Sequence, residues 1–241
     1  GSGGVQVGSD VFDPLTGVGS FDCRFPDGPD SVTVSVTVSD DDGASDTDSV
    51  EVTVDNVKPT VVLSGAVTVD EGQTKTYTYT VTDPGADTLT VVESCGANGT
   101  RSDTLAVNSF DCTFPDGPAF SDVTVRVTDS DGAVDTDDQK VSVAVVNVAP
   151  VGVLGNSGPV NEGSAASVSF TGQFDPSVGD TAAGFSYSYD FDNDGDFTDV
   201  GDVAGSASAS ASIPAGLLAD GPVSFTVRAR IADRNGDFTD Y

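Results

Sequence analysis

The stretch SFDCRFPDGP at residues 20–29 returns as SFDCTFPDGP at residues 109–118, with nine of its ten positions identical. The two copies lie 89 residues apart, measured from Cys23 to Cys112. A fixed period of this length indicates a tandem array of small domains, not one globule built around a single buried site. The repeat therefore favours a spacer, adhesin or filament module over an enzyme.

Other markers recur at nearly the same interval and set the domain limits. Asn-Val-Lys-Pro at residues 56–59 returns as Asn-Val-Ala-Pro at 147–150, and Glu-Gly at 71–72 returns at 162–163. From their phase we expect the chain to be a piece of a longer array. The expected parts are the C-terminal half of a β-sandwich repeat at 1–57, a complete repeat at 58–148, and a repeat lacking its last strand at 149–241.

Composition narrows the classes of function. The chain has 39 acidic and 9 basic residues, a net charge of −30 and no histidine. Nucleic acids and anionic membranes are poor partners for such a surface, and no apolar run approaches membrane-spanning length, so we expect no direct membrane insertion. Without an imidazole base, we expect no enzyme of the nucleophilic type. The charge fits either binding of Ca²⁺ by hard oxygen ligands or solvation in a salty medium.

Valines alternate with polar residues along several segments, which predicts strands with one buried face. Asp-Gly and Asn-Gly turns separate these segments at close intervals, and no segment carries a helical stripe. We therefore predict an all-β fold of tandem immunoglobulin-like antiparallel β-sandwiches. The clearest expected strands are residues 32–38, 50–54, 123–127, 141–145 and 223–231.

The chain has three cysteines, and their positions follow the repeat. Cys95 and Cys112 lie 17 residues apart in the complete repeat, and we expect them to form a disulfide. Cys23 is the counterpart of Cys112, and its own partner is expected to precede residue 1. Disulfides are typical of an oxidising, extracellular setting. Three buried free thiols are the alternative.

The third repeat carries an insertion, and this insertion holds the sharpest candidate for a metal site. Residues 190–199 read DFDNDGDFTD, which fits the first half of a helical-hand calcium loop, where alternate carboxylates wrap the ion. The pattern fails at its twelfth position, where Gly201 replaces a bidentate Glu. The alternative is a polar turn whose side chains accept backbone hydrogen bonds. The candidate ligands are Asp190, Asp192, Asp194, Asp196 and Asp199.

A second set of acids recurs near the limits of the repeats. Acidic Asp-x-Asp-Gly turns precede the last strand of a repeat, and a Glu-Gly pair follows the first strand of the next. We hypothesise that acids of two successive repeats, with linker residue Asn56 or Asn147, converge on one cation and stiffen the joint. Hairpin-turn chemistry alone is the alternative. The candidates are Glu71, Asp129, Asp131, Asn147, Glu162 and Asp175.

The sequence YSYDFDNDG at residues 187–195 resembles the Tyr-x-Trp-Asp-Phe-Gly-Asp-Gly signature of polycystic-kidney-disease (PKD) domains, with Tyr189 in place of the tryptophan. The Asn-Val-Ala-Pro linker, the Glu-Gly pair and the late Asp-x-Asp-Gly turn are also similar to PKD-like and cadherin-like repeats of large bacterial surface proteins. This resemblance implies a β-sandwich fold, an extracellular location, frequent calcium binding, and a role as a spacer or in contacts with protein or carbohydrate.

Our leading hypothesis is an extracellular structural protein that forms a stalk, adhesin or surface filament, with calcium as cofactor and other repeats or neighbouring subunits as partners. The alternative is an accessory module of a secreted hydrolase that binds polysaccharide or protein. Carbohydrate platforms need exposed aromatic rings, whereas we expect Tyr77, Tyr79, Tyr187 and Tyr189 to face the core. An open sheet edge completed by a strand of another subunit is a third reading, beside a simply shortened chain.

Overall fold

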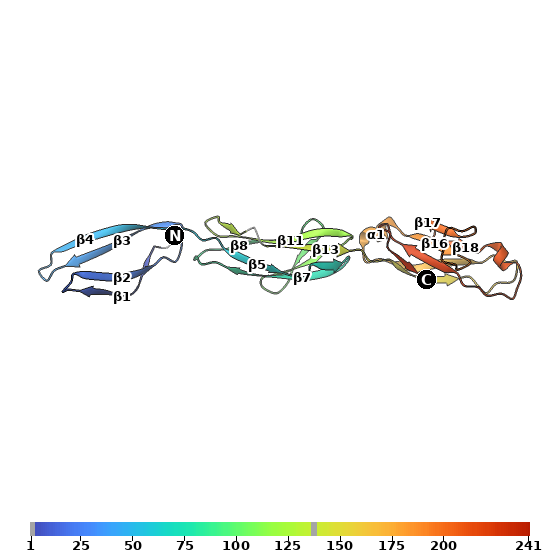
Figure 1. The fold of residues 1–241 in the computed structure, drawn as a ribbon, viewed down its shortest axis with the longest axis horizontal. Helices are drawn as coiled ribbons and strands as arrows, with labels where there is room; N and C mark the ends of the chain where they lie inside the picture. The colour runs from blue at the N-terminus through green and yellow to red at the C-terminus, as the bar shows by residue number, and fades with distance from the viewer. Residues whose placement is uncertain (1–2, 136–138) are drawn as a thin grey trace. The chain divides into compact units, whose positions relative to one another are not determined.

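The computed structural model describes residues 3–135 and 139–241, and nearly all of its regular structure is β-strand (Figure 1). Two short helical segments interrupt the strands, α1 at Val178–Ala183 and a 3-10 turn at Ala215–Leu218. Within the described residues no helix is long and apolar enough to cross a bilayer. The prediction of an all-β fold made of antiparallel sheets is confirmed.

The N-terminal half-repeat consists of two antiparallel hairpins. β1 (Val5–Asp13) pairs with β2 (Val18–Arg24), and β3 (Asp30–Ser39) pairs with β4 (Ser45–Val54). In the turn of the second hairpin, the Asp40 carboxylate accepts hydrogen bonds from two backbone N–H groups. Gly43 closes this turn with φ +89°, a conformation that glycine adopts readily. Most side chains of these four strands are exposed, so the half-repeat has paired backbones but little buried apolar surface.

The complete repeat contains two sheets. The first has the strand order β5 (Thr60–Ser64), β7 (Thr74–Thr82), β10 (Ser109–Thr113) and β9 (Thr100–Asp103). The second has the order β12 (Val134–Asp135), β11 (Ala119–Thr128), β13 (Lys140–Val146) and β6 (Thr68–Asp70), and β8 (Thr90–Ser94) also pairs with β11. β6 and β13 run parallel, whereas β5 with β7, β9 with β10, and β8 and β12 with β11 pair antiparallel.

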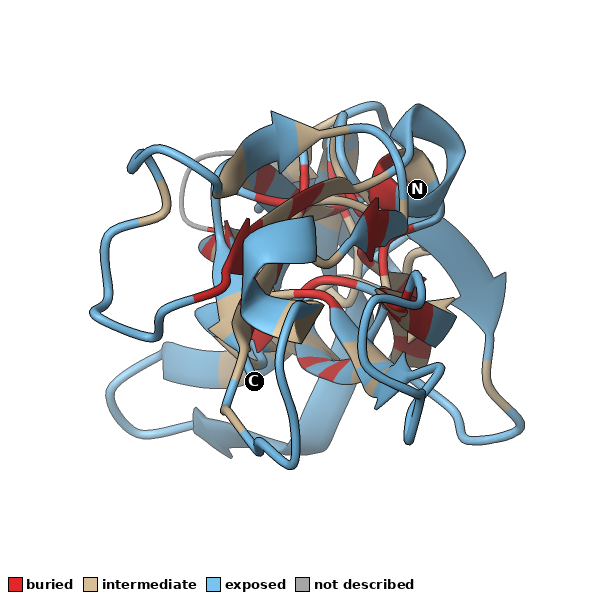
Figure 2. Cartoon of the chain, turned by 90° about the vertical axis from the view of Figure 1, so that its right-hand side faces the viewer, coloured by how far each residue is buried: buried red, intermediate tan, exposed pale blue. Residues whose placement is uncertain are grey.

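The core of the complete repeat follows from the period-two pattern. Val123, Val125 and Val127 of β11 are each at most 2% exposed, while the residues between them face outward or toward the sheet's margin. Tyr77 of β7 is fully buried, stacks on Phe110 and donates its hydroxyl to the carbonyl of Ala66. Figure 2 shows buried residues within some strands of the chain, while the loops and several other strands are exposed. The core placement of Tyr77, Tyr79, Tyr187 and Tyr189 is confirmed.

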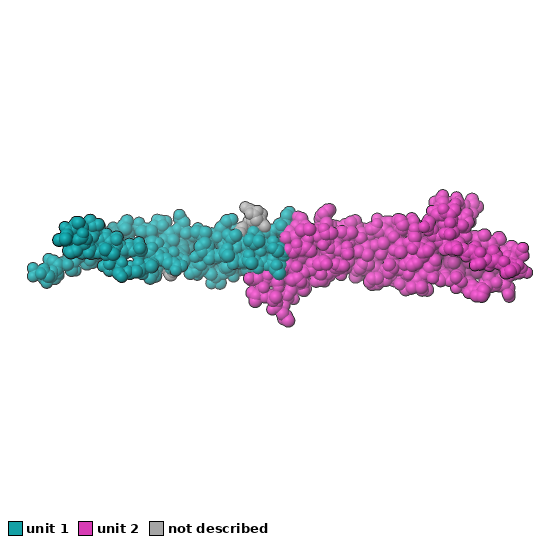
Figure 3. Space-filling model, turned by 60° about the horizontal axis from the view of Figure 1, so that its bottom comes forward, with its two compact units in different colours: residues 1–64, 78–94, 124–140 teal, residues 65–77, 95–123, 141–241 magenta. Residues whose placement is uncertain are grey.

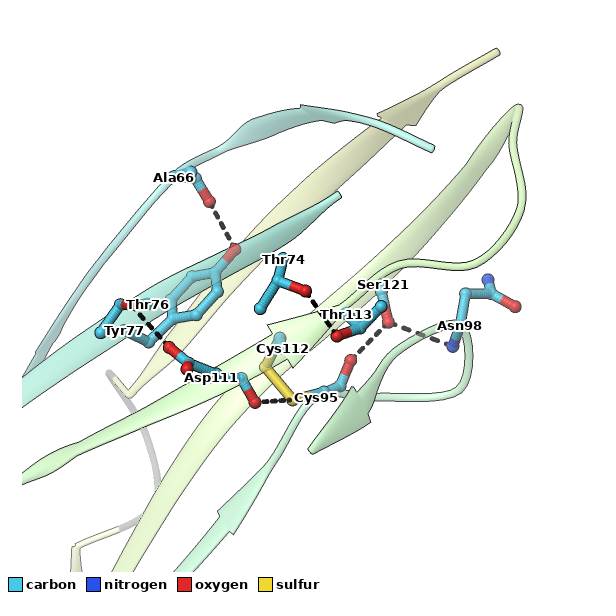
Figure 4. Close-up of a disulfide and its surroundings, with 10 residues drawn as sticks. All are labelled: Ala66, Thr74, Thr76, Tyr77, Cys95, Asn98, Asp111, Cys112, Thr113 and Ser121. Carbon is cyan, nitrogen blue, oxygen red and sulfur yellow. Dashed lines mark hydrogen bonds between the residues drawn. A yellow bond between two sulfur atoms is a disulfide. The ribbon is translucent and has the colours of Figure 1, made fainter. Parts of the chain in front are cut away.

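The disulfide between Cys95 and Cys112 is present, with its Cα atoms 5.6 Å apart. Cys95 follows β8, and Cys112 lies in β10, so the bond joins the two sheets of the repeat (Figure 4). The hydroxyl of Ser121 donates to the carbonyl oxygen of Cys95 at 2.6 Å, which fixes the backbone beside the bond. Cys23, the counterpart of Cys112, is a free cysteine.

The third repeat has two sheets around an aromatic core. Phe170 contacts the rings of Tyr187, Tyr189 and Tyr241, and Ile231 is fully buried in the same cluster. The first sheet has the strand order β14 (Val151–Asn156), β15 (Ser167–Phe174) and β18 (Ser210–Ser212). The second has the order β17 (Val203–Ser206), β16 (Ser186–Asp190), β19 (Arg228–Ala232) and β20 (Phe238–Asp240).

The strand expected over residues 223–231 is shorter than predicted, because only its second half is paired. β19 begins at Arg228, and residues 221–227 instead line a groove of about 1040 Å³ that also borders Val160. In the complete repeat, β13 lies between the two equivalent segments and covers them. Val69, the counterpart of Val160, is therefore 3% exposed there, whereas Val160 is 38% exposed. The short β20 pairs with β19 as β12 pairs with β11 in the complete repeat.

The chain forms two compact units, and each of them includes part of the complete repeat (Figure 3). The first unit holds the half-repeat with part of the complete repeat, and the second holds the rest of the complete repeat with the third repeat. Contacts between neighbouring repeats are therefore contacts within one unit. The first unit contains residues 1–64, 78–94 and 124–140, and the second contains residues 65–77, 95–123 and 141–241.

We expect the Cys95→Ala/Cys112→Ala double variant to lose about 3 kcal/mol of unfolding free energy in the complete repeat, the loop-closure value for a loop of this size. Urea unfolding followed by amide exchange of β10 and β11 measures this loss. Cys23→Ala is the matched control, because Cys23 forms no disulfide within the described residues. An equal effect of the two substitutions would contradict a stabilising role for the bond.

Candidate metal centre

Three buried carboxylates meet inside the second unit. Glu71 follows β6, Asp175 follows β15, and Asp180 lies in α1. Their exposed fractions are 0%, 4% and 0%, and one oxygen from each lies within 4.8 Å of the others. We call these three residues the Glu71 cluster. It draws one acid from the complete repeat and two from the third.

Glu71 is held in this position by the backbone of its own repeat and of the linker. Its Oε2 accepts a hydrogen bond from the N–H of Gly117 at 2.7 Å, and its Oε1 accepts one from the N–H of Val148 at 2.8 Å. Gly72 has φ +74°, and a Cβ at this position would lie 2.7 Å from the carbonyl oxygen of Pro176. The recurring Glu-Gly pair thus places a carboxylate and allows the next repeat to approach closely.

The two aspartates are positioned by the start of α1. Ser177 is the N-cap: its hydroxyl accepts from the N–H of Asp180 at 3.1 Å. The N–H of Ser177 donates to Oδ1 of Asp175 at 2.8 Å, and its hydroxyl donates to Asp116 at 2.8 Å. A single serine therefore orients two acids of its own repeat and contacts one acid of the preceding repeat.

The cluster has fewer hydrogen-bond donors than its oxygens require. Oδ2 of Asp175 and both carboxylate oxygens of Asp180 are buried and accept no hydrogen bond, and of these only Oδ1 of Asp180 has an ion-pair partner, Arg234. Buried polar atoms in native proteins are nearly always satisfied by a partner, and buried charges are paired or coordinate metals. Two unpartnered carboxylate oxygens beside a third carboxylate are the donor set of a hard divalent cation. The residues present fit such an ion.

Burial and mutual repulsion change the acidity of these groups. Loss of water raises the pKa of Glu71, Asp175 and Asp180 above their ordinary values, and the charges of the neighbouring acids raise each pKa further. Hydrogen bonds from Gly117 and Val148 oppose the rise at Glu71. Each carboxyl group of the cluster therefore loses its proton at a higher pH than it would in water.

The linker residue Asn147 contacts the Asp-x-Asn-Gly turn of the third repeat, residues 233–236, which we call its late turn. The side-chain amide of Asn147 donates to Asp233 at 2.8 Å and to Asp237 at 2.9 Å. Asn235, in the same turn, donates its side-chain N–H to the carbonyl of Gly117 at 2.9 Å. The linker, the Asp-Gly-Pro turn of one repeat and the Asp-x-Asn-Gly turn of the next are therefore connected by direct hydrogen bonds.

The guanidinium of Arg234 borders the cluster. Its Nε lies 2.8 Å from Oδ1 of Asp180, and its Nη2 donates to Oδ2 of Asp116. The side chain is 42% exposed, so it lies at the rim of the cluster while Asp180 is fully buried.

A related arrangement lies in the first unit, which we call the Asp87 cluster. Asp87 shares one oxygen triad with Asp83 and Asp129 and another with Asp27 and Asp131, each within 4.8 Å. One oxygen each of Asp27, Asp83 and Asp87 is buried without a hydrogen bond. Asp27, Asp83 and Asp87 are partly buried, Asp129 is buried and Asp131 is exposed, so the Asp87 cluster is more open than the Glu71 cluster.

The two clusters share two repeat positions, because Asp83 and Asp87 are the counterparts of Asp175 and Asp180. Asn56 donates to Asp129 at 2.8 Å, as Asn147 donates to Asp233. Asp129 also accepts hydrogen bonds from backbone N–H groups of its turn. Burial alone would raise the pKa of Asp129, but the hydrogen bonds from Asn56 and from the turn lower it below its ordinary value. Each joint thus uses the linker asparagine to hold the turn of the following repeat.

The structure brings together most of the second set of predicted residues. Glu71 and Asp175 meet at one joint, where Asn147 also lies, and Asp129 and Asp131 lie at the other. Glu162 lies apart from both clusters, and its Oε2 accepts from the N–H of Gly221 at 3.2 Å, as Glu71 accepts from Gly117. The sequence analysis missed six acids of the joints: Asp27, Asp83, Asp87, Asp116, Asp180 and Asp233.

The loop at residues 190–199 has a different character. Oxygens of Asp190, Asp192 and Asp194 lie within 4.8 Å of one another. Asp190 is buried, but both of its oxygens accept backbone N–H groups of the loop. Asp192, Asp194 and Asp196 each accept the N–H two residues further on, which is ordinary turn chemistry. The charges of Asp194 and Asp196 raise the pKa of Asp199. Metal binding by this loop stays a prediction.

No protein-family model and no curated protein matches the chain. Among solved structures, the adhesin InvE of Yersinia pseudotuberculosis is similar over 76% of this chain and 57% of that chain, at 15% identity and a TM-score of 0.28. The glucan utilization locus protein SGBP-B of Bacteroides ovatus, solved with a mixed-linkage heptasaccharide, covers 90% and 51% at 14% identity and a TM-score of 0.18. Surface layer protein SbsC, domains 4–9, covers 100% and 42% at 16% identity and a TM-score of 0.25.

The chain thus spans about half the length of the solved chains it matches. At TM-scores this low, the three structures assign neither the type of repeat nor a function to this chain.

The raised pKa values predict a local dependence on pH. In metal-free protein the folded cluster holds protons that the unfolded chain has released, so stability falls as pH rises through the raised pKa values. We expect the protection factors of the Gly117 and Val148 amides to increase as pH is lowered from about 7 to about 5. Hydrogen exchange, corrected for its intrinsic rate, measures this.

The Asp175→Asn/Asp180→Asn double variant is the control, and it should flatten the pH profile because two of the three titrating groups are gone. Protection that decreases on acidification in the unmodified chain would overturn the assignment.

Proposed function

We propose that this chain is part of an extracellular or cell-surface structural protein whose tandem β-sandwiches are joined by divalent cations, Ca²⁺ above all. The observation that carries the proposal is the Glu71 cluster. It joins acids of two successive repeats and leaves two buried carboxylate oxygens without a partner. Asp83 and Asp87, the counterparts of Asp175 and Asp180, also meet at the other joint, where Asp129 is the third acid of the Asp87 cluster.

The donor set favours Ca²⁺ over transition metals and Mg²⁺. All the candidate ligand atoms of the clusters are carboxylate oxygens, and the chain contains no histidine. The carboxylates sit on a turn, a loop and a short helix, a mixture that suits the large and flexible coordination shell of Ca²⁺ better than the strict octahedron of Mg²⁺. Affinities of extracellular calcium modules, about 10⁻⁴ to 10⁻³ M, match such a setting.

A bound cation would change the joint from repulsive to cohesive. Glu71 belongs to one repeat, and Asp175 and Asp180 belong to the next, so their negative charges oppose close approach when no cation is present. A cation between them offsets this repulsion and links the repeats through shared ligands. A stalk or filament needs this property, because each repeat must keep its orientation toward its neighbours.

The alternative function is a carbohydrate- or protein-binding module of a secreted hydrolase. Four of the five tyrosines are used in the cores: Tyr77 and Tyr189 are fully buried, and Tyr79 and Tyr187 are at most 8% exposed, whereas Tyr241 is 38% exposed. The joints have a counterpart at each repeat boundary, as expected of a scaffold. We therefore favour the structural role and infer no catalytic one.

Calcium titration of the 241-residue chain tests the proposal. We expect Ca²⁺ to raise the protection factors of the Gly117 and Val148 amides, which donate to Glu71. We also expect it to narrow the distribution of chain dimensions derived from small-angle scattering. Asp180→Asn should weaken the binding seen at these amides by about tenfold or more, because a charged ligand oxygen is lost. Unchanged protection and dimensions up to millimolar Ca²⁺ would refute the proposal.

Asp194→Asn is the matched control within the acidic loop. It removes the same charge from an exposed side chain that lies outside both joints. It should leave the response of the Gly117 and Val148 amides unchanged. If Asp194→Asn abolishes all calcium binding while Asp180→Asn has no effect, the loop and not the joint is the site.

A further inference from the structure

The two joints differ at one position of the late turn. The turn of the complete repeat reads Asp129-Ser130-Asp131-Gly132, and the turn of the third repeat reads Asp233-Arg234-Asn235-Gly236. Its second residue is therefore Ser130 in one joint and Arg234 in the other. Each side chain contacts an aspartate at the same repeat position, Asp87 in one cluster and Asp180 in the other.

These two residues contact the corresponding oxygen of the equivalent aspartate, Ser130 by a hydrogen bond and Arg234 by an ion pair. The hydroxyl of Ser130 donates to Oδ1 of Asp87 at 2.6 Å, and Nε of Arg234 lies 2.8 Å from Oδ1 of Asp180. In both joints Oδ2 of the same aspartate is buried without a hydrogen bond. The second residue of the turn thus orients the aspartate and leaves one oxygen for the cluster.

The charge that each residue adds is different. Ser130 is neutral, whereas Arg234 is a cation whose pKa is raised, first by its hydrogen bond with Asp116 and then by the charges of Asp116, Asp180 and Glu71. Arg234 is connected to an acid of each repeat, Asp116 and Asp180. It therefore supplies part of the positive charge that a metal ion would otherwise supply, and it repels a divalent cation placed in the same cluster.

We propose that the residue at this turn position sets how strongly each joint depends on a divalent cation. The inference rests on the proposed function. Arg234 lowers the affinity of the Glu71 cluster for the cation and holds that joint together in the absence of metal. Ser130 contacts the equivalent oxygen without adding a positive charge, so the Asp87 cluster carries no such penalty from its turn.

The size of the effect follows from electrostatics. A unit charge a few ångströms from a divalent ion, at the effective dielectric of a protein surface, changes the binding constant by about tenfold or more. Salt screens exposed charges over about 8–10 Å, so the effect should shrink as ionic strength rises.

The experiment is calcium binding to the full 241-residue chain by isothermal titration, with amide exchange at Gly117 and Val148 as the local readout. Arg234→Ser should tighten the binding reported by these amides by about tenfold or more and lower their protection in chelator. Arg234→Lys keeps the charge and should stay within about threefold of the unmodified chain.

Arg126→Ser is the matched control, because it removes the same charge from an exposed position in β11. It should change the affinity by less than about threefold, since only the screened, long-range effect of net charge remains. The reciprocal variant Ser130→Arg should weaken binding at the Asp87 cluster, read at the Ala133 amide, which donates to Asp129.

The outcomes separate this inference from the function on which it rests. If no variant binds calcium at the joints, the proposed function fails. If calcium binds but Arg234→Ser behaves as Arg126→Ser does, the inference is wrong. Weaker binding in Arg234→Ser would also overturn it, because it would make Arg234 a residue that positions Asp180 for the ion. Circular dichroism of each variant checks that the strands are intact.

Discussion

The hydrogen bonds of Glu71 are the constraint on which the joint between repeats depends. Its two oxygens accept the N–H groups of Gly117 and Val148, so one side chain connects a turn of its repeat with the linker. These bonds place a buried carboxylate where the third repeat presents Asp175 and Asp180. An apolar residue here would leave two backbone donors without this acceptor and remove the charge that a cation needs. Local backbone satisfaction and cation binding therefore require the same acid.

Much of the fold could be predicted because it follows from local patterns. Alternating valines and Asp-Gly turns specify strands and hairpins in this chain, and the position of Cys95 relative to Cys112 specified the disulfide. The strand over 223–231 was predicted too long because a strand needs a neighbour as well as a pattern. Residues 223–227 have the right alternation, but they border a groove where β13 lies in the complete repeat. Pairing between distant segments is not visible in a single stretch of sequence.

The site was predicted in part. Glu71, Asp129, Asn147 and Asp175 stood out because they recur at fixed intervals. Asp180 was missed because its spacing differs from that of its neighbour. It lies 93 residues after Asp87, whereas Asp175 lies 92 residues after Asp83. The connecting segment is therefore one residue longer in the third repeat, where it forms α1. The calcium-like loop at 190–199 has the better sequence pattern, yet its buried acid is satisfied by backbone donors. Spacing identifies candidate ligands, whereas only the three-dimensional contacts show which oxygens lack partners.

The parallel pairing of β6 with β13 has a mechanical consequence for the complete repeat. β6 lies near the start of this repeat and β13 near its end, and they are joined by backbone bonds such as that from Glu71 to the carbonyl of Val146. A force that pulls on both ends of the repeat loads these bonds in shear, so they must break together and not one after another. The disulfide adds a covalent limit, because residues 95–112 form a closed loop that tension cannot extend. The complete repeat therefore resists extension first at its terminal strands.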